Sequence, residues 1–417
     1  MKGVFIIIDG LGDLPCSLLN DKTPLEAAKT PNLDELAKKS KLGYMYSVKE
    51  GIVPESDSAI LSVLGHDYFV GYRGILEALG ARIEVKHGDL AVRTNFATID
   101  NMNDRNVVDR RAGRNLTTKE ATILTREINN KVKLKCCKFI FKNTAQHRGV
   151  LILKGGFSDN ITNTDPAYHS QGKAKLSDKF KFSVPLDDEE ITHFTANAIN
   201  EFIEKSYKVL AEHPINKERK KKGLLVANIL LTRDASIDLP ELKKFDKWGS
   251  ACYMPLEIGI SKLLNMTNFP FNYPDLKSYD VYENLFYGLK IACKFAVKVL
   301  RKQYKKYDYI YFHFKETDIP GHDNKPLEKK AMVEMLDKEF FSYLKKFAEK
   351  TKIKVLITAD HSTPCKVKGH SDDPVPVLFY DGMEEVTKDQ KYCEKDSRKG
   401  ELGKIYGKDL FKKTGFT

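Results

Sequence analysis

The sequence predicts an α/β protein: a doubly wound, mostly parallel sheet with a smaller α+β domain inserted into it. Largely apolar runs near both ends of the 417-residue chain, such as residues 4–8 and 353–358, are typical of strands buried on both faces. Segments with helical spacing of apolar residues alternate with these runs, as crossover helices do in a parallel sheet. The middle of the chain, residues 86–224, has shorter strands and more polar loops.

The first strand is expected at residues 4–8, a β-branched and aromatic run that ends at Asp9 and a glycine. Glycine permits the sharp turn that such a strand end needs. Thr30 and Pro31 are then suited to the N-cap and first turn of a helix. Strand, turn and helix in this order predict the start of a doubly wound sheet.

The same pattern returns in the C-terminal third of the chain. Apolar residues recur at helical spacing in residues 281–302 and 327–347. Buried strands are expected at residues 307–314, 353–358 and 374–380. We therefore predict that the two ends of the chain share one sheet.

The middle segment has the pattern of a separate α+β domain. Short strands are expected at residues 90–98 and 149–154, and a helix near residues 195–210. We interpret the basic run at residues 217–222 as a solvated linker or helix end, after which a buried strand at 224–231 resumes the larger domain. The predicted domains are therefore residues 1–85 with 225–417, and the insert, residues 86–224.

The net charge of +12, from 69 Lys and Arg against 57 Asp and Glu, fits a nucleic acid, a membrane surface or an anionic small molecule as partner. The sequence has no aromatic-basic motif typical of nucleic-acid binding. No apolar stretch approaches the roughly 18 residues that a membrane span needs. We expect neither a nucleic acid nor a membrane as partner, and the sequence leaves the oligomeric state open.

The seven cysteines are odd in number and include no CxxC pair. The chain begins with Met1, a lysine and a short apolar run that is far from the core of a signal peptide. Both observations predict a reducing, cytoplasmic location.

Carboxylates and imidazoles follow three of the predicted strands, and ligands of open α/β sheets bind outside the carboxyl ends of strands. A single Asp at a strand end is more often a turn former, but a turn does not explain the whole set. Carboxylates and imidazoles without thiolates suit Mn, Co or Zn, and Mg where oxygens dominate, and the set is large enough for two ions. The residues are Asp9, Asp318, His322, Asp360, His361 and His370.

Ser56 is the candidate nucleophile. It follows a proline-marked loop and precedes an apolar helical run, so it is expected at a helix N-terminus, where backbone N–H groups favour a phosphate. On its own, a serine there would be an N-cap. Only the neighbouring metal ligands make an activated hydroxyl a reasonable expectation, because a cation lowers the pKa of a hydroxyl.

These motifs together resemble the alkaline phosphatase superfamily and, within it, the archaeal-type cofactor-independent phosphoglycerate mutases. The strand-end Asp9, the early serine loop, TDxxGH at residues 317–322 and ADHSTP at residues 359–364 carry the general resemblance. More specific matches extend along the chain: KTPLEAAKTPN at 22–32, EALGA at 77–81, NFAT at 95–98, DRRAGR at 109–114, SD at 158–159, TDP at 164–166 and LGKIYGKD at 402–409.

The resemblance implies an alkaline-phosphatase-like metal-binding domain, an inserted substrate-binding domain, and a two-metal enzyme that interconverts 3-phosphoglycerate and 2-phosphoglycerate through a phosphoserine, with no bisphosphoglycerate. The chain departs from the family pattern at Ile60, where a histidine is usual. The implied first metal site comprises Asp9, Ser56, Asp360 and His361, and the second comprises Asp318, His322 and His370.

The resemblance also suggests which residues bind the small phosphorylated substrate. Arg110, Arg111 and Arg114 match its basic motif, since guanidinium groups grip phosphate or carboxylate. Arg148 and Lys315 are further candidates. Asp57, beside the nucleophile, is a candidate general acid and base, although a first-turn acid is also simply favoured by the helix dipole.

The main alternative is a metal-dependent phosphomonoesterase, or another phosphomutase, with the same metal-binding edge and a different insert. The excess positive charge fits the attraction of an anionic substrate under either interpretation.

Overall fold

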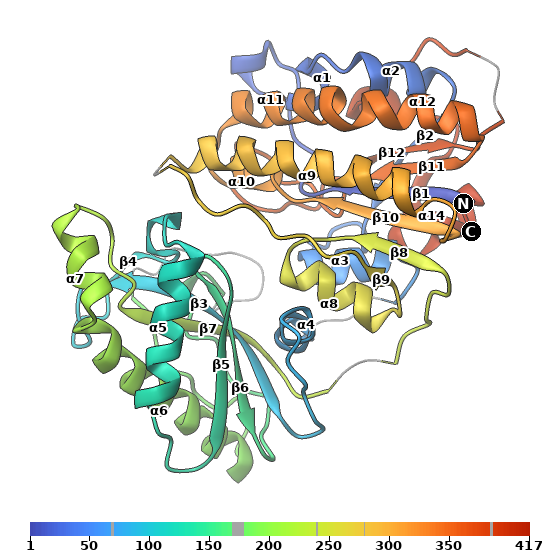
Figure 1. The fold of residues 1–417 in the computed structure, drawn as a ribbon. Coiled ribbons are helices and arrows are strands. Elements are labelled where there is room, and N and C mark those ends of the chain that lie inside the picture. The colour runs from blue at the N-terminus through green and yellow to red at the C-terminus, as the bar shows by residue number, and fades with distance from the viewer. Residues whose placement is uncertain (68–70, 169–178, 239–240, 279, 384–386) are drawn as a thin grey trace.

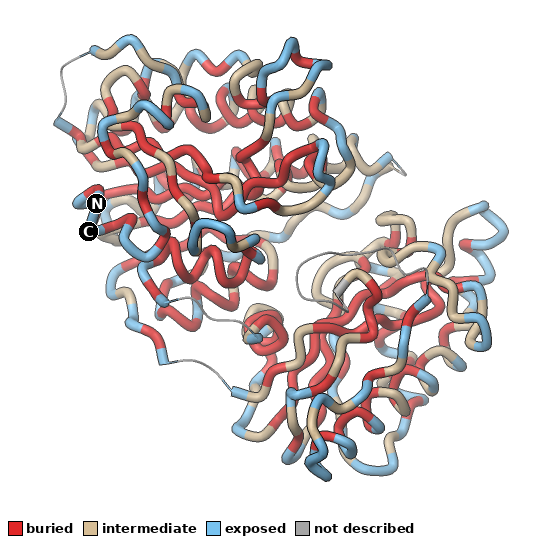
Figure 2. Tube along the Cα trace, turned by 180° about the vertical axis from the view of Figure 1, so that it is seen from behind, coloured by how far each residue is buried: buried red, intermediate tan, exposed pale blue. Residues whose placement is uncertain are grey.

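The computed structural model describes residues 1–417 except 68–70, 169–178, 239–240, 279 and 384–386. The described chain forms two lobes, each built on its own sheet (Figure 1). Buried residues follow the strands of both sheets (Figure 2), and each sheet has a separate hydrophobic core. Among the described residues, every helix is too short or too polar to cross a lipid bilayer.

The larger lobe is built on an eight-stranded sheet. In spatial order its strands are β13 (Gly403–Tyr406), β2 (Lys41–Tyr46), β12 (Val375–Tyr380), β11 (Lys354–Thr358), β1 (Gly3–Ile8), β10 (Tyr309–Phe314), β8 (Trp248–Ala251) and β9 (Thr267–Asn268). β1 runs parallel to both β10 and β11, while β12 is antiparallel to its two neighbours. Ile8 pairs with Phe314 and Ile7 with Thr358, so three central strands end at one edge. The predicted mostly parallel sheet is confirmed.

Helices cover both faces of this sheet (Figure 1). On one face are α2 (Pro31–Lys38), α9 (Val281–Gln303), α11 (Pro326–Leu336) and α12 (Ser342–Thr351), and on the other are α3 (Ser56–Val63), α8 (Pro255–Leu263) and α14 (Leu410–Thr414). Phe5 of β1 packs edge-on against Phe411 of α14, with 5.3 Å between ring centroids. The helix predicted at residues 327–347 is interrupted between α11 and α12 by one π-helical turn, Asp337–Phe341.

The smaller lobe has a five-stranded sheet. Its strands are β4 (Val107–Asp109), β3 (Leu90–Ile99), β6 (Arg148–Lys154) and β5 (Lys138–Ala145), with β7 (Ile229–Ser236) also paired to β3. The helices α5 (Thr118–Lys131) and α6 (Glu190–Ala211) pack on this sheet, where Phe141 contacts Phe202. The helix α4 (Arg73–Gly80) contacts both α8 and β3, so it joins the two lobes.

The prediction that a strand at residues 224–231 returns to the larger sheet is wrong. The strand is β7, and it pairs with β3 of the smaller sheet, Leu231 opposite Asn95 and Ile229 opposite Ala97. An apolar run shows that a strand is buried, but it does not show which sheet buries it. The smaller lobe therefore includes β7, beyond the boundary predicted at residue 224, and the outer limits of the domains stay a prediction.

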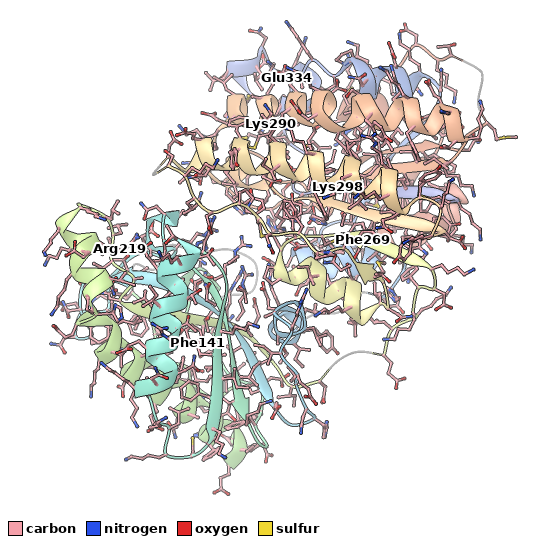
Figure 3. The ribbon with its side chains drawn as sticks, in the orientation of Figure 1. Phe141, Arg219, Phe269, Lys290, Lys298 and Glu334 are labelled. Atoms are coloured by element: carbon pink, nitrogen blue, oxygen red, sulfur yellow. The ribbon has the colours of Figure 1, made fainter. Side chains whose placement is uncertain are left out.

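The basic run at residues 217–222 lies mainly in α7 (Pro214–Lys221). Its lysines are exposed, as expected for a solvated helix end, but Arg219 is 2% exposed. Arg219, labelled in Figure 3, donates to the carbonyl of Leu225 and pairs with Glu120 of α5. This arginine therefore anchors α7 to the smaller lobe.

A buried lysine fixes two loops at the carboxyl edge of the larger sheet. Lys329 of α11 is 0% exposed, and its ammonium donates to the carbonyls of Gly12 and Thr363 at 3.1 and 3.0 Å. It also pairs with Asp13 at 2.8 Å. Because Gly12 and Thr363 follow β1 and β11, this one side chain holds together the loops that leave both strands.

We predict that Lys329→Met lowers the free energy of unfolding by about 3–5 kcal/mol, because the buried charge of Asp13 loses its partner. Chemical denaturation would measure the loss. Lys330→Met is the matched control: its half-buried ammonium pairs with Glu334, and its loss should cost less than about 1 kcal/mol. Equal stability of the two variants would contradict the role given to Lys329.

Candidate active site

Seven polar side chains meet at the carboxyl edge of the larger sheet, and all seven were predicted from the sequence as metal ligands. They are Asp9 after β1, Asp318 and His322 in α10 (Asp318–His322) after β10, Asp360 and His361 after β11, His370 before β12, and Ser56 in α3.

The first group surrounds the Nε2 atom of His361. This nitrogen lies 3.2 Å from Ser56 Oγ, 3.4 Å from Asp360 Oδ2 and 3.8 Å from Asp9 Oδ1. Among the described residues, the buried atoms Asp9 Oδ1 and Asp360 Oδ2 have no hydrogen-bond partner. Burying two unsatisfied carboxylate oxygens side by side is costly, and a cation between them and the imidazole would satisfy both.

The second group is centred on Asp318. Its Oδ2 lies 3.4 Å from His322 Nε2, and its Oδ1 lies 3.8 Å from His370 Nε2. The rings of His361 and His370 stack with 3.6 Å between centroids, so the two groups adjoin. Ligand atoms of Asp318, His361 and His370 also lie within 4.8 Å of one another. The predicted division of the ligands, with His322 in the second group, therefore stays a prediction.

Hydrogen bonds fix the tautomer of His361. Its Nδ1 lies 3.1 Å from Thr363 Oγ1, and that hydroxyl donates its own proton to Asp318 Oδ1 at 2.8 Å. The hydroxyl therefore accepts from Nδ1–H, and Nε2 of the neutral ring keeps its lone pair. A partner that holds the outer ring nitrogen in this way is typical of metal-binding histidines.

His370 and His322 have the same orientation. Nδ1 of His370 lies 2.9 Å from the carbonyl of Pro54, and Nδ1 of His322 lies 3.3 Å from the carbonyl of Lys368. Since a carbonyl only accepts, each Nδ1 carries a proton, and each Nε2 faces Asp318. The donor set thus fits divalent cations.

The charges at this edge also suit cations. Burial and the neighbouring Asp9 raise the pKa of Asp360 well above its usual value. Burial would raise the pKa of Asp9 too, but Lys315 and a hydrogen bond from His313 outweigh it and lower that pKa. Burial lowers the pKa of His361 well below its usual value. Asp9 is therefore a carboxylate and His361 a neutral imidazole, the forms that bind metals.

Ser56 is the first residue of α3, and the N-cap is Glu55, so Ser56 is not the capping residue. Its hydroxyl faces the first group, where the free N–H groups and positive end of the helix dipole favour an arriving anion. Ile60, one turn later, packs in the core of the larger lobe.

Asp57 is buried beside Ser56, and its Oδ1 accepts the N–H of Ser58 at 2.9 Å. Burial raises the pKa of Asp57, and the charge of Arg73 offsets part of that rise. A carboxyl group with a raised pKa is suited to both giving and taking a proton near neutral pH.

Two of the predicted substrate-binding arginines are held by carboxylates. Arg110 donates from Nε and Nη2 to the two oxygens of Asp165 at 2.6 and 2.7 Å. Arg114 donates to Asp323 Oδ2 at 2.6 Å, and the hydroxyl of Tyr282 donates to the same oxygen at 2.9 Å. Because Arg114 belongs to the smaller lobe and Asp323 and Tyr282 to the larger, this cluster ties the lobes together.

The other predicted substrate residues border cavities between the lobes. Arg111 and Arg148 line a cavity of about 90 Å³ that also reaches Asp318 and His322. A larger cavity of about 450 Å³ adjoins it and is lined in part by Arg148 and Lys315. The Lys315 ammonium contacts Asp9 and lies 3.2 Å from Glu257 Oε1.

Sequence reasoning missed a buried cluster of three arginines. They are Arg73 of α4, Arg93 of β3 and Arg233 of β7, each no more than 8% exposed. Glu77 lies between two of them, with its Oε1 3.5 Å from Arg93 Nε and 3.9 Å from Arg73 Nε. Burial and the neighbouring Arg233 lower the pKa of Arg93 well below its usual value. Two further carboxylates border the cluster: Glu55 Oε2 lies 3.8 Å from Arg73 Nη1, and Asp234 Oδ2 lies 3.5 Å from Arg233 Nε.

This arginine cluster adjoins the nucleophile. Arg73 Nη1 lies 3.8 Å from Oε2 of Glu55, the exposed residue directly before Ser56. Glu55 and Ser56 therefore lie between the candidate metal ligands and the cluster. A signal was present in the sequence, since Arg93 interrupts the apolar run of β3, where an unpaired charge is costly.

The chain is similar to known proteins along nearly its whole length. A family model described as 2,3-bisphosphoglycerate-independent phosphoglycerate mutase matches residues 37–216. A protein of that name from Pyrococcus horikoshii is 38% identical, with 98% of this chain and 95% of the relative aligned.

Two solved structures have the same fold. A Pyrococcus horikoshii protein superimposes with a TM-score of 0.75 at 30% identity, covering 100% of this chain and 98% of the other. The cofactor-independent phosphoglycerate mutase from Thermoplasma acidophilum gives a TM-score of 0.54 at 29% identity, covering 99% and 98%.

We predict that Asp318→Ala lowers the content of bound divalent cation by about one ion per chain, because Asp318 is the carboxylate that His322 and His370 share. Elemental analysis after dialysis against Mn²⁺ would measure the content. Asp372→Ala, an exposed carboxylate two residues after His370, is the control and should keep the full content. An unchanged content in Asp318→Ala would overturn the proposed second site.

Proposed function

We propose a residue-level mechanism from the premise that this chain belongs to the family of 2,3-bisphosphoglycerate-independent phosphoglycerate mutases, which its 38% identity over 98% of its length shows. The resemblance predicted from the sequence is confirmed, and the chain is a phosphoglycerate mutase. The reaction moves a phosphoryl group between the 3- and 2-hydroxyls of glycerate without a bisphosphoglycerate, a step of glycolysis and gluconeogenesis.

One observation supports this mechanism most strongly. The Nε2 atom of His361 faces two buried carboxylate oxygens, Asp9 Oδ1 and Asp360 Oδ2. Neither oxygen has a hydrogen-bond partner among the described residues. Ser56 Oγ lies against the same nitrogen. A hydroxyl beside a cation site at a helix N-terminus is suited to accept a phosphoryl group.

We assign Asp9, Ser56, Asp360 and His361 to one divalent cation, and Asp318, His322 and His370 to a second. Mn²⁺, Co²⁺, Zn²⁺ and Mg²⁺ all suit ligand sets of carboxylates, a hydroxyl and imidazoles. When bound, the cations supply positive charge that lowers the pKa of a hydroxyl and offsets the charge of the transferring phosphoryl group.

The chain's own groups then perform two transfers. Ser56 Oγ attacks phosphorus in line, which breaks the ester bond to glycerate and forms a phosphoserine. Glycerate stays in the cleft between the lobes and turns its other hydroxyl toward the phosphoserine. Attack by that hydroxyl returns the phosphoryl group and restores Ser56.

The buried arginines are suited to holding the substrate. We propose that Arg93, Arg73 and Arg233 bind the carboxylate or phosphate of phosphoglycerate, since guanidinium groups pair with such anions through two hydrogen bonds. Arg111 and Arg148 contact it from the smaller cavity. The carboxylate pairs of Arg110 and Arg114 favour a structural role for those two residues.

Asp57 is the proposed general acid and base. Its raised pKa and its place beside Ser56 suit a group that protonates the departing oxygen of glycerate and later takes a proton from the attacking hydroxyl. The two transfers differ only in which hydroxyl reacts, so one carboxyl group can serve both.

A mutase must keep water from the phosphoserine, and the contact of the lobes serves this need. Arg114 of the smaller lobe pairs with Asp323 of the larger one, where Tyr282 also binds. A phosphomonoesterase with the same metal-binding edge, the alternative considered from the sequence, would release phosphate instead of transferring it.

We propose a cellular compartment and a partner for the enzyme. The seven cysteines are free thiols, which fits a reducing cytoplasm. We propose a small phosphorylated acid as the partner, with no nucleic acid and no membrane. The oligomeric state stays open.

We predict that Ser56→Ala abolishes formation of 2-phosphoglycerate from 3-phosphoglycerate, because the group that takes the phosphoryl is gone. An enolase-coupled assay with Mn²⁺ and without 2,3-bisphosphoglycerate would measure this, beside an EDTA-treated control. Ser62→Ala, a buried serine in the same helix, should keep activity. Near-normal turnover of Ser56→Ala would refute its role as nucleophile.

We also predict that Arg93→Gln raises KM for 3-phosphoglycerate by about 10- to 100-fold, the cost of about 1.4–2.8 kcal/mol of charge-assisted hydrogen bonding. Steady-state kinetics would measure the change. Arg126→Gln, on the exposed side of α5 in the same lobe, should leave KM unchanged. If the two variants share one KM, the arginine cluster does not bind substrate.

A further inference from the structure

The two carboxylate oxygens of Asp9 face different surroundings. Oδ1 faces His361 and has no hydrogen-bond partner among the described residues. Oδ2 lies 2.9 Å from His313 Nε2 and contacts the ammonium of Lys315. The first oxygen points to a place where a cation fits, and the second already has a cation beside it.

Glu257 of α8 completes the surroundings of that ammonium. It is 1% exposed, and its Oε1 lies 3.2 Å from Lys315 Nζ. Its Oε2 is buried and, in the part of the chain that the structure describes, forms no hydrogen bond. A buried carboxylate with an unsatisfied oxygen is costly, and the ammonium of Lys315 alone does not satisfy it.

Asp9, Glu257 and His313 have the composition of a metal site. One ligand atom from each lies within 4.8 Å of the others, and all three residues are buried. The outer nitrogen of His313 lies 2.7 Å from the hydroxyl of Tyr311, which can accept or donate. His313 can therefore turn either a proton or a lone pair toward the centre of the group, as an ammonium or a metal ion requires.

We propose that Asp9, Glu257 and His313 form a third cation-binding site, which the ammonium of Lys315 occupies permanently. A divalent cation binds at this third site once the ammonium is removed. In this role Lys315 is a positioning residue for Asp9 and not the substrate contact predicted from the sequence. A tethered ammonium cannot be removed by a chelator or exchanged, so one oxygen of Asp9 stays neutralised while the other serves an exchangeable ion.

The alternative role of Lys315 is to bind substrate phosphate. Its side chain does line the 450 Å³ cavity between the lobes. The charged end, however, lies between two buried carboxylates, and moving it away would leave both of them without its charge. The contacts therefore favour the role of Lys315 as the cation of the third site.

The test compares metal content among variants. Elemental analysis after dialysis against Mn²⁺ or Mg²⁺ should show one more ion per chain in Lys315→Ala than in the unaltered protein. Lys315→Met fills the third site with an apolar side chain and should show no extra ion. Lys315→Ala/Glu257→Gln lacks one ligand and should return to the original content.

The test measures the difference in metal content between variants, so it does not depend on how many ions the unaltered protein binds. A failure of the two-metal assignment would therefore be distinguishable from a failure of this proposal. Equal metal content in Lys315→Ala and the unaltered protein would overturn the proposal, as would an extra ion that persists in the double variant.

A second measurement covers loss of folding. If Lys315→Ala is unstable without metal, millimolar Mn²⁺ should raise its thermal midpoint more than that of Lys315→Met. The same rise in thermal midpoint for both variants, or no rise in the thermal midpoint of Lys315→Ala, would also overturn the proposal.

Discussion

The active site depends on one electrostatic constraint: two buried aspartates, Asp9 and Asp360, and the half-buried Asp318 lie together where neighbouring parallel strands end. Their mutual repulsion and loss of hydration would destabilise the fold unless positive charge lies among them. The parallel order of β10, β1 and β11 makes this crowding unavoidable, because it brings all three strand ends to one edge. Positive charge at this edge therefore stabilises the fold as well as suiting the chemistry.

The surrounding residues hold this edge in place. Lys329 joins the loops after β1 and β11, and hydroxyl or carbonyl oxygens orient the outer nitrogens of His361, His370 and His322. These bonds turn the Nε2 atoms of the three histidines toward the aspartates. A preformed site of this kind avoids reorganisation when substrate charge arrives.

The sequence predicted those parts of the site that depend on local pattern. Asp9, Asp318 and Asp360 follow buried strands, and the parallel sheet brings strand ends together, so pattern and topology were sufficient. The arginine cluster was missed because Arg73, Arg93 and Arg233 lie on three elements that meet only in the folded chain. Glu257 and His313 were missed for the same reason. The strand at β7 was expected, but its sheet was not, because burial alone does not identify a partner strand.

The most direct test of the account is an X-ray structure of crystals soaked in Mn²⁺, with an anomalous difference map collected at the manganese edge. We predict two peaks, one among Asp9, Ser56, Asp360 and His361 and one among Asp318, His322 and His370, with none beside Lys315. No peak near Ser56, or a single peak elsewhere in the molecule, would contradict the proposed site.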